Sequence, residues 1–232
     1  MTKKNTAVKS SSPEEFLSVR DRLLACETVK WAEGFSFVAG VDEAGRGCMA
    51  GPVVAAAVVF TERNRIPAGV FDSKQLSHAE RMRMRERILA EPSILYAVGE
   101  VSPEEIDRIN ILRATWKAMG MALEQLKEVQ FALIDGNPVK GLPVPSQSIV
   151  KGDAKSASIA AASILAKTHR DLYMEKIAAV YPEYHFEIHK GYCTELHTEA
   201  VRKYGPCPIH RMTFEPVRSI LNPPTHIQPE LF

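Results

Sequence analysis

Residues 37–60, FVAGVDEAGRGCMAGPVVAAAVVF, are the stretch that decides the fold of this chain. The first seven letters, FVAGVDE, predict a strand, and AGRGCMAGP predicts a glycine-rich turn. The run VVAAAVVF at 53–60 predicts a second strand. Because that run is apolar throughout, we expect the second strand to be buried on both faces.

Helix and strand patterns alternate along the rest of the chain. Apolar spacing predicts helices from 14 to about 26, from 79 to 89, and over a long stretch from the capping-box pattern at Ser102 to about Leu126. Strands are predicted at 94–101 and 131–135, with a Gly- and Pro-rich loop at 136–148. Two further helices are predicted, from Ser156 to about Val180 and near Thr194–Tyr204. This order predicts an α/β fold, a sheet covered by helices with a small helical C-terminal appendage.

Composition is that of a soluble globular protein. Of the 232 residues 45% are hydrophobic and 25% charged, and the net charge is +1. That balance does not indicate a nucleic-acid binder. Arginines nevertheless alternate over 81–87 and lysines recur over 151–176, a pattern that fits either a basic binding face or a solvated helix face. With four cysteines but no C-x-x-C pair, no signal peptide and no 18-residue apolar run, we expect a cytoplasmic protein without a membrane segment.

Four acids lie at or near the predicted ends of elements. Asp42 and Glu43 end the first strand, Asp135 ends a later one, and Asp153 precedes the long helix. Acids at several strand ends can meet in space, and carboxylate oxygens suit Mg²⁺ or Mn²⁺. Two such ions, ~3.5–4 Å apart, stabilise both the attacking and the leaving oxygen of a phosphodiester. Each acid alone fits a turn or helix cap equally well, so by themselves they support only a possible metal site.

Glu43 presents a geometric difficulty. Adjacent residues of a regular strand point to opposite faces, so Asp42 and Glu43 would not share one site. The glycine turn that follows would resolve this if the strand bends or ends at Glu43.

The loop Gly45-Arg46-Gly47 follows the acids. Glycine lets a backbone approach a ligand closely, although a plain hairpin turn has the same composition. The chain has no G-x-x-x-x-G-K phosphate loop, and a dinucleotide fingerprint would need a helix where the run at 53–60 predicts a strand.

The stretch 41–60 closely resembles ribonuclease HII. The resemblance continues, in the same order, through DSKQLS (72–77), LIDGN (133–137), KGDAKSASIAAASILAKTHRD (151–171), HKGYCT (189–194) and GPCPIHRMTFEPV (205–217). It implies the ribonuclease H-like fold, a mixed sheet flanked by helices. It also implies endonucleolytic hydrolysis of the RNA strand of RNA–DNA hybrids and cleavage 5′ to ribonucleotides embedded in duplex DNA. The products would carry 3′-hydroxyl and 5′-phosphate ends, as ribonucleotide excision repair requires.

The resemblance also implies roles for individual residues. Asp42, Glu43 and Asp135 match the principal metal ligands and Asp153 the fourth catalytic acid, for two Mg²⁺ or Mn²⁺ ions. Gly45, Arg46 and Gly47 match the loop whose backbone reads the 2′-hydroxyl. Tyr192 matches a tyrosine that packs on the sugar following the ribonucleotide, where a capping aromatic is the alternative. Phosphate contacts are expected from residues in matching blocks: Ser73, Lys74, Lys155, Lys167 and Lys190.

The expected segments are an N-terminal extension and helix (1–33), a ribonuclease H-like catalytic domain (34–180), a C-terminal helical region (181–221) and a flexible tail (222–232). Two departures from the family pattern stand out. Cys193 replaces the usual glycine after Tyr192, and this change leaves open how far the protein prefers an RNA-to-DNA junction. Cys48-Met49 replaces a commoner small or proline-containing pair after the glycine loop.

Alternative readings concern the C-terminal part of the chain. Cys193, His197, Cys207 and His210 have a spacing that resembles a zinc site. The tail residues Gln228, Leu231 and Phe232 resemble the short bacterial sliding-clamp-binding motif, although a Leu-Phe pair folded back on the core is equally consistent. For the whole protein, a non-catalytic hybrid-binding or clamp-tethered adaptor on the same fold is the alternative to a nuclease. We expect a monomer.

Overall fold

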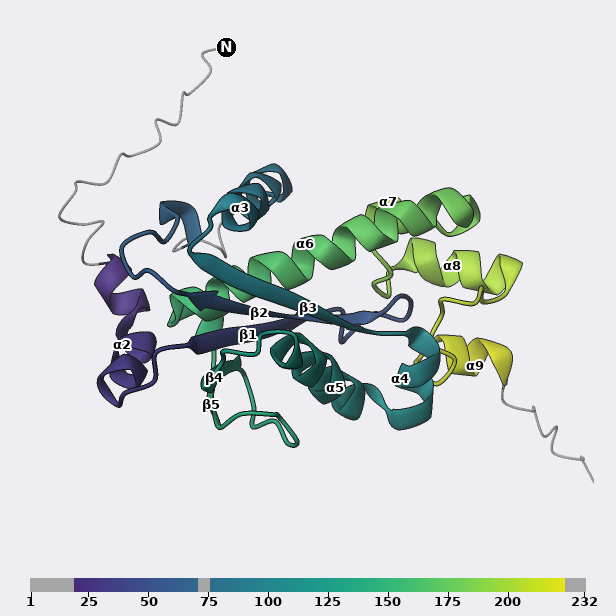
Figure 1. Ribbon diagram of the computed structural model, residues 1–232. Helices are drawn as coiled ribbons and strands as arrows, with labels where there is room; N and C mark the ends of the chain where they lie inside the picture. Colours follow the sequence, from purple (N-terminus) through teal and green to yellow (C-terminus); the bar gives the residue numbers. More distant parts are fainter. Residues whose placement is uncertain (1–18, 71–75, 224–232) are drawn as a thin grey trace, which may run out of the picture.

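The computed structural model describes residues 19–70 and 76–223. Its centre is a five-stranded sheet in the order β3-β2-β1-β4-β5 (Figure 1). The strands are β1 (Val38–Ala44), β2 (Val53–Phe60), β3 (Ile94–Val101), β4 (Phe131–Asp135) and β5 (Ser146–Ile149). β2 is antiparallel to both β1 and β3, whereas β4 is parallel to β1 and to β5. The expected mixed sheet flanked by helices is confirmed.

Helices cover both faces of this sheet. The α-helices are α2 (Ala25–Ala32), α3 (His78–Ala90), α4 (Pro103–Ile109), α5 (Ile111–Glu124), α6 (Ala157–Val180), α7 (Phe186–His189), α8 (Glu195–Tyr204) and α9 (Val217–Leu221), with short 3₁₀ turns η2 (Gly152–Ala154) and η3 (Pro182–Tyr184). α5 packs on one face, and α6 with α3 packs on the other. None of the helices in the described ranges is long and apolar enough to cross a membrane.

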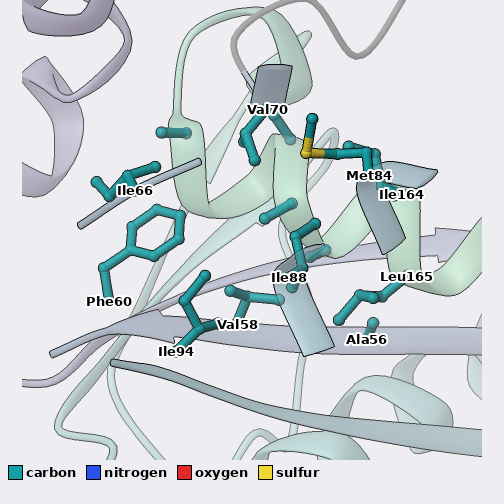
Figure 2. Packing of buried hydrophobic residues seen from close by; sticks show 14 of the residues in the cluster. Ala56, Val58, Phe60, Ile66, Val70, Met84, Ile88, Ile94, Ile164 and Leu165 are labelled. Atoms are coloured by element: carbon teal, nitrogen blue, oxygen red, sulfur yellow. The ribbon is translucent and has the colours of Figure 1, made fainter. Parts of the chain in front are cut away.

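β2 is buried at every position, as its composition predicts. Its side chains alternate between the two layers because successive strand residues point to opposite faces. Figure 2 shows Val58 and Phe60 of β2 in one cluster with Ile88 of α3 and Leu165 of α6. Val59 belongs to the cluster beneath α5.

The long helix α6 lies very close to β1. A Cβ atom added to Gly40 would lie 2.1 Å from the Ser158 carbonyl carbon, so only glycine fits there. Small residues on the helix, including Ala157, Ala160 and Ala161, are fully buried against the sheet. This close approach brings the first turns of α6 beside the end of β1 that carries Asp42.

The residues after α6 form the expected helical appendage. η3, α7, α8 and α9 pack on the C-terminal half of α6 through a separate apolar cluster, which includes Met174, Phe186, Val201 and Val217. The loop after β1 joins this cluster through Met49. The appendage is therefore packed against the loop that precedes β2.

Three predicted elements differ in the structure. The long helix expected after Ser102 is two helices, α4 and α5, because Asn110 has a φ of 68° and interrupts the helical backbone. The loop expected at 136–148 contains the start of β5, whose polar sequence SQSI on the sheet edge lacks an apolar strand pattern. The first predicted helix lies partly outside the described residues, and helical structure continues from Ala25 to Ala32, beyond the expected end.

Candidate active site

Asp42 and Asp135 are neighbours on the face of the sheet covered by α6. β1 and β4 are parallel, with Val41 beside Ile134, so the next residues of the two strands lie side by side. The Asp42 carboxylate is buried and accepts hydrogen bonds from the Glu43 N–H at 2.7 Å and from Ser163 of α6. The predicted meeting of acids at strand ends is thus what the topology produces.

Burial, together with the neighbouring charges of Glu43 and Asp135, raises the pKa of Asp42 to about 8 against the opposing hydrogen bond from Ser163. Burial also raises the pKa of Glu43, with Arg46 opposing the shift and Asp135 adding to it. The three carboxylates are therefore close enough to repel one another in a poorly solvated place.

The strand does not bend at Glu43. β1 pairs regularly with β2 through Ala44, with Asp42 beside Ala56 and Glu43 beside Ala55. However, pairing with β4 ends at Val41 and Ile134. Glu43 is nevertheless close enough to Asp135 for that charge to contribute to its raised pKa, although the two residues start from opposite faces of the sheet. The expected bend of the strand at Glu43 is therefore not seen in its pairing with β2.

Asp135 is anchored by the turn that precedes α6. Its Oδ1 atom accepts hydrogen bonds from the Gly152 N–H at 2.6 Å and the Asp153 N–H at 3.4 Å. A Cβ on Gly152 would lie 2.6 Å from Ile159 Cδ1 and 3.1 Å from the same carboxylate oxygen, so glycine allows this approach. The backbone of Asp153 is thereby placed beside the Asp135 carboxylate, and Asp153 lines the adjacent cavity.

This cavity, about 440 Å³, lies between the glycine loop, the middle of α6 and Tyr192. Its lining residues are Glu43, Ala44, Gly45, Arg46, Gly47, Arg81, Asp153, Ser163, Ile164, Lys167 and Tyr192. Tyr192 is 42% exposed, and Lys167 Nζ lies 5.4 Å from the centre of its ring while pairing with Asp171 at 2.7 Å. The predicted glycine loop, tyrosine and one of the predicted lysines therefore share one cavity with two of the acids.

Other predicted contacts lie elsewhere. Lys155 is exposed outside this cavity, and Lys190 pairs with Glu175 at 2.7 Å. Ser73, Lys74 and the tail residues Gln228, Leu231 and Phe232 lie outside the described residues.

The structure constrains the two glycines of the loop differently. Gly45 has a φ of +92°, and a Cβ there would lie 2.1 Å from Nε of Arg170 and 2.8 Å from the Pro52 carbonyl oxygen. Gly47 has no such constraint, because a Cβ there would meet nothing within 4 Å. The fold therefore requires glycine at 45, whereas at 47 it leaves open space beside the cavity.

The donor atoms fit a hard divalent cation. They are carboxylate oxygens, mutually repulsive and largely buried, and the Glu43 carboxylate pairs with Arg46 at 3.0 Å. Within residues 19–70 and 76–223, no three His, Cys, Asp or Glu side chains already surround a point that a metal ion could fill.

The predicted zinc ligands do not converge. Cys193 is exposed with its Sγ 3.9 Å from the Thr198 hydroxyl, whereas His197 and His210 are buried and hydrogen-bonded to each other. Cys207 contacts only His210 of the other three, through Sγ and Nδ1 at 3.1 Å. The structure thus gives no support to a zinc module among the described residues.

Several residues of the site were not found from the sequence. Ser163 and Arg81 line the cavity, and the buried Arg170 and Arg211 hold the glycine loop. Ser163 is marked locally only as a polar residue in an alanine-rich stretch, and Arg81 only as one of the alternating arginines over 81–87. The partners of Arg170 and Arg211 lie up to 166 positions away in the chain, so spacing could not reveal them.

Comparison with known proteins agrees with this fold. The family model described as Ribonuclease HII matches residues 39–217. The Ribonuclease HII of Chlamydia pneumoniae is 47% identical over 219 residues, covering 93% of this chain and 98% of the relative. The Ribonuclease HII of Endomicrobium trichonymphae is 54% identical over 192 residues, covering 82% and 90%.

Solved structures show the same architecture. Ribonuclease H2 from Pyrococcus horikoshii OT3 aligns with a TM-score of 0.67 at 32% identity, covering 79% of this chain and 96% of that one. The PCNA:RNase HII complex from Archaeoglobus fulgidus gives a TM-score of 0.66 at 28% identity, covering 77% and 95%. Because the family model and the curated relatives span most of the sequence, this chain belongs to the ribonuclease HII family and is an enzyme of the ribonuclease H type.

Proposed function

We propose that this ribonuclease hydrolyses the RNA strand of RNA–DNA hybrids and cuts 5′ to single ribonucleotides in duplex DNA, leaving 5′-phosphate and 3′-hydroxyl ends. One observation carries the proposal: two of the four acids, Glu43 and Asp153, line the same cavity as the glycine loop Gly45-Arg46-Gly47. Acids supply the means of hydrolysis, and backbone groups at a glycine loop supply a way to sense the 2′-hydroxyl that distinguishes RNA from DNA.

Two divalent ions, Mg²⁺ or Mn²⁺, would be held by Asp42, Glu43, Asp135 and Asp153. Their carboxylate oxygens suit such ions, and a cation offsets the burial and the carboxylate repulsion that raise the pKa of Asp42. When bound, the ions lower the pKa of a water molecule and offset the charge that develops on the phosphodiester.

The chain itself prepares this site before a substrate arrives. The Glu43 N–H and Ser163 hold the Asp42 carboxylate, and the Gly152 N–H holds that of Asp135, so neither needs to reorganise. Lys167 places a positive charge beside Tyr192, where it can meet a phosphate of the strand whose sugar packs on the ring.

The test is cleavage of a duplex carrying one embedded ribonucleotide, with Mg²⁺ or Mn²⁺ and with chelator. We expect metal-dependent cleavage that Asp42→Asn and Asp135→Asn each reduce by roughly two orders of magnitude or more. Glu124→Gln, on the exposed end of α5, is the matched control and should retain full activity. Cleavage without metal, or a wild-type rate of cleavage by Asp42→Asn, would refute the assignment of the acids as metal-binding catalytic residues.

The same assay separates the nuclease from the alternative adaptor. A non-catalytic hybrid-binding protein would bind the duplex and leave it uncut under every metal condition. Gel-shift measurements on the same samples would show this outcome directly.

We further propose that the tail binds the bacterial sliding clamp through Gln228, Leu231 and Phe232, that the enzyme is monomeric, and that it acts in the cytoplasm in ribonucleotide removal and replication. The relative from Archaeoglobus fulgidus was solved as a PCNA:RNase HII complex, so a relative of this chain has a protein partner. Deleting residues 228–232 should abolish clamp binding and spare cleavage in the ribonucleotide assay. Undiminished clamp binding by the truncated chain would exclude the tail.

A further inference from the structure

Two fully buried arginines hold the glycine loop from behind. Arg211 donates to the carbonyl oxygens of Gly45 at 2.7 Å, Arg46 at 3.0 Å and Gly51 at 2.9 and 3.0 Å. Arg170, on α6, donates to those of Ala50 at 2.9 Å, Pro52 at 3.0 Å and Lys190 at 2.8 Å. Both side chains are 0% exposed. Together they bind the loop after β1 at both of its ends.

The partners of these arginines are unusual for buried charges. Within the described part of the chain, every hydrogen bond that the two guanidinium groups donate ends on a backbone carbonyl, and neither group pairs with a carboxylate. A buried ion costs several kcal/mol to desolvate, and well-packed apolar side chains stabilise a core as well or better. Stability alone therefore gives little reason for two such residues, whereas the rigid fork of arginine fixes the direction of several carbonyls at once.

The direction of these carbonyls decides where the loop's N–H groups point. The only cis peptide bond among the described residues is Glu215–Pro216, so the loop peptides are trans. In a trans peptide the C=O and N–H bonds point in opposite directions. Because the carbonyls of Gly45 and Arg46 face Arg211, the N–H groups of Arg46 and Gly47 face away from it. Neither N–H donates to any other residue that the structure describes.

Arg170 joins this loop to the segment that carries Tyr192. It bonds the Lys190 carbonyl as well as those of Ala50 and Pro52, and its guanidinium carbon lies 5.9 Å from the centre of the Tyr192 ring. The Met49 N–H also donates to the Gly191 carbonyl at 3.0 Å. The loop and the tyrosine are therefore held at a fixed spacing across the cavity that both line.

We propose that Arg170 and Arg211 are positioning residues for ribonucleotide recognition. Arg211 holds the N–H groups of Arg46 and Gly47 toward the cavity as donors to the 2′-hydroxyl oxygen. Arg170 sets the distance between that loop and the ring of Tyr192. This inference rests on the proposed function, since it assigns the means by which the same site distinguishes ribose from deoxyribose.

The decisive measurement is a ratio of dissociation constants. Wild type, Arg170→Lys and Arg211→Lys would be titrated, in chelator to prevent cleavage, with a duplex containing one ribonucleotide and with the all-DNA duplex of the same sequence. Lysine keeps the charge but cannot orient several carbonyls. We expect each variant to lower the preference for the ribonucleotide duplex by roughly tenfold, the effect of one or two misplaced hydrogen bonds.

The ratio separates positioning from a merely structural role. Partial unfolding lowers the concentration of active protein equally for both duplexes and leaves the ratio unchanged. Arg218→Lys, an exposed arginine paired with Glu215, is the control and should keep the wild-type ratio. A ratio within twofold of wild type in both variants would overturn the inference. If wild type itself shows no preference, the proposed function fails first.

A second measurement needs no variant. By NMR hydrogen exchange, the amides of Arg46 and Gly47 should exchange rapidly in the free protein and become protected by the ribonucleotide duplex but not by the all-DNA duplex. Slow exchange in the free protein would mean that these N–H groups are already bonded internally, and the inference would be wrong.

Discussion

The Nε2 atoms of His197 and His210 lie 3.0 Å apart in the buried core of the C-terminal region. Which of the two histidines donates in this hydrogen bond follows from the partners of their Nδ1 atoms. His210 Nδ1 accepts from the Cys207 N–H at 2.9 Å, so we infer that its proton is on Nε2 and points at His197. His197 then carries its proton on Nδ1, 2.9 Å from the Tyr192 carbonyl oxygen. Two neutral histidines thus connect the Cys207–His210 turn, within the appendage, to the backbone of Tyr192.

This pair predicts a loss of stability in mild acid. Burial lowers the pKa of His197 to about 3 and that of His210 to about 4, from an ordinary value near 6.5. The unfolded chain therefore binds more protons, and stability falls as the pH drops from about 6.5 toward 4. Urea unfolding should show His210→Gln less stable than wild type at pH 7 but with a smaller further loss at pH 5. Its exposed counterpart His169→Gln should follow the wild-type pH dependence, and a parallel loss in His210→Gln would contradict the prediction.

Substituting alanine for each loop glycine should lower stability at position 45 and substrate binding at position 47. Gly45→Ala places a Cβ against Arg170 and Pro52 at a positive φ, so we expect a loss of stability of about 1–3 kcal/mol. Gly47→Ala meets open space and should leave the melting temperature unchanged while weakening binding of the ribonucleotide duplex, since its methyl group borders the cavity. Thermal melting and duplex titration of both variants test this contrast. Equal melting losses in the two would show that Gly47 is only structural.

Tyr192 should contribute through its ring. We expect Tyr192→Phe to cut a single embedded ribonucleotide at nearly the wild-type rate and Tyr192→Ala to lose about tenfold or more, the effect of one lost aromatic contact. Continuous RNA–DNA hybrids, which need no RNA-to-DNA junction at the cut, should be affected less. Tyr96→Ala is the control, because Tyr96 is similarly exposed, at 41% against 42%, but lies on β3. A large loss in Tyr192→Phe would transfer the role from the ring to the hydroxyl.

A buried glutamate on α2, whose carboxylate meets the start of α6, should make stability decrease with rising pH. Glu27 is fully buried and accepts from the hydroxyls of Ser156 and Ser158, both at 2.6 Å, while its Oε2 has no partner among the described residues. Burial raises its pKa, so the stability that its protonated form contributes is present at low pH and is lost as the pH rises above the unfolded value near 4.5.

Glu27→Gln removes this titration and keeps an acceptor for the two serines. We expect the variant to be at least as stable as wild type at pH 8 and to lose that advantage near pH 4, as measured by urea unfolding. Glu33→Gln, which removes an exposed partner of Lys30, should shift stability only slightly and without this trend. A variant less stable than wild type at pH 8 would show that the carboxylate is stabilising in its ionised form.

Much of the fold follows from local patterns. The strands at 53–60, 94–101 and 131–135 and the long helix ending at Val180 have the predicted bounds, give or take a residue. Such elements can be predicted from the sequence because their own apolar residues form the buried face. β5 was missed because a polar edge strand is defined by its partner β4, and the break at Asn110 was missed because the apolar spacing continues across it.

The acids could be named from the sequence, since strand ends, residue type and the resemblance to ribonuclease HII all indicated them. The sequence left open how Asp42 and Glu43 could serve one site. The fold places Asp135 close enough to act on the pKa of both, and this closeness depends on a strand that begins only at Phe131.

By itself, then, the sequence determined the elements, the family and the chemical character of the site, because these depend on residue types and on spacing along one segment. Only the tertiary structure decided what holds the site in shape. Arg170, Arg211, His197 and His210 act through hydrogen bonds to backbone groups, several of them more than 100 positions away. Any residue offers the same carbonyl to a guanidinium or an imidazole, so no pattern of side chains could have marked these partners before the chain was folded.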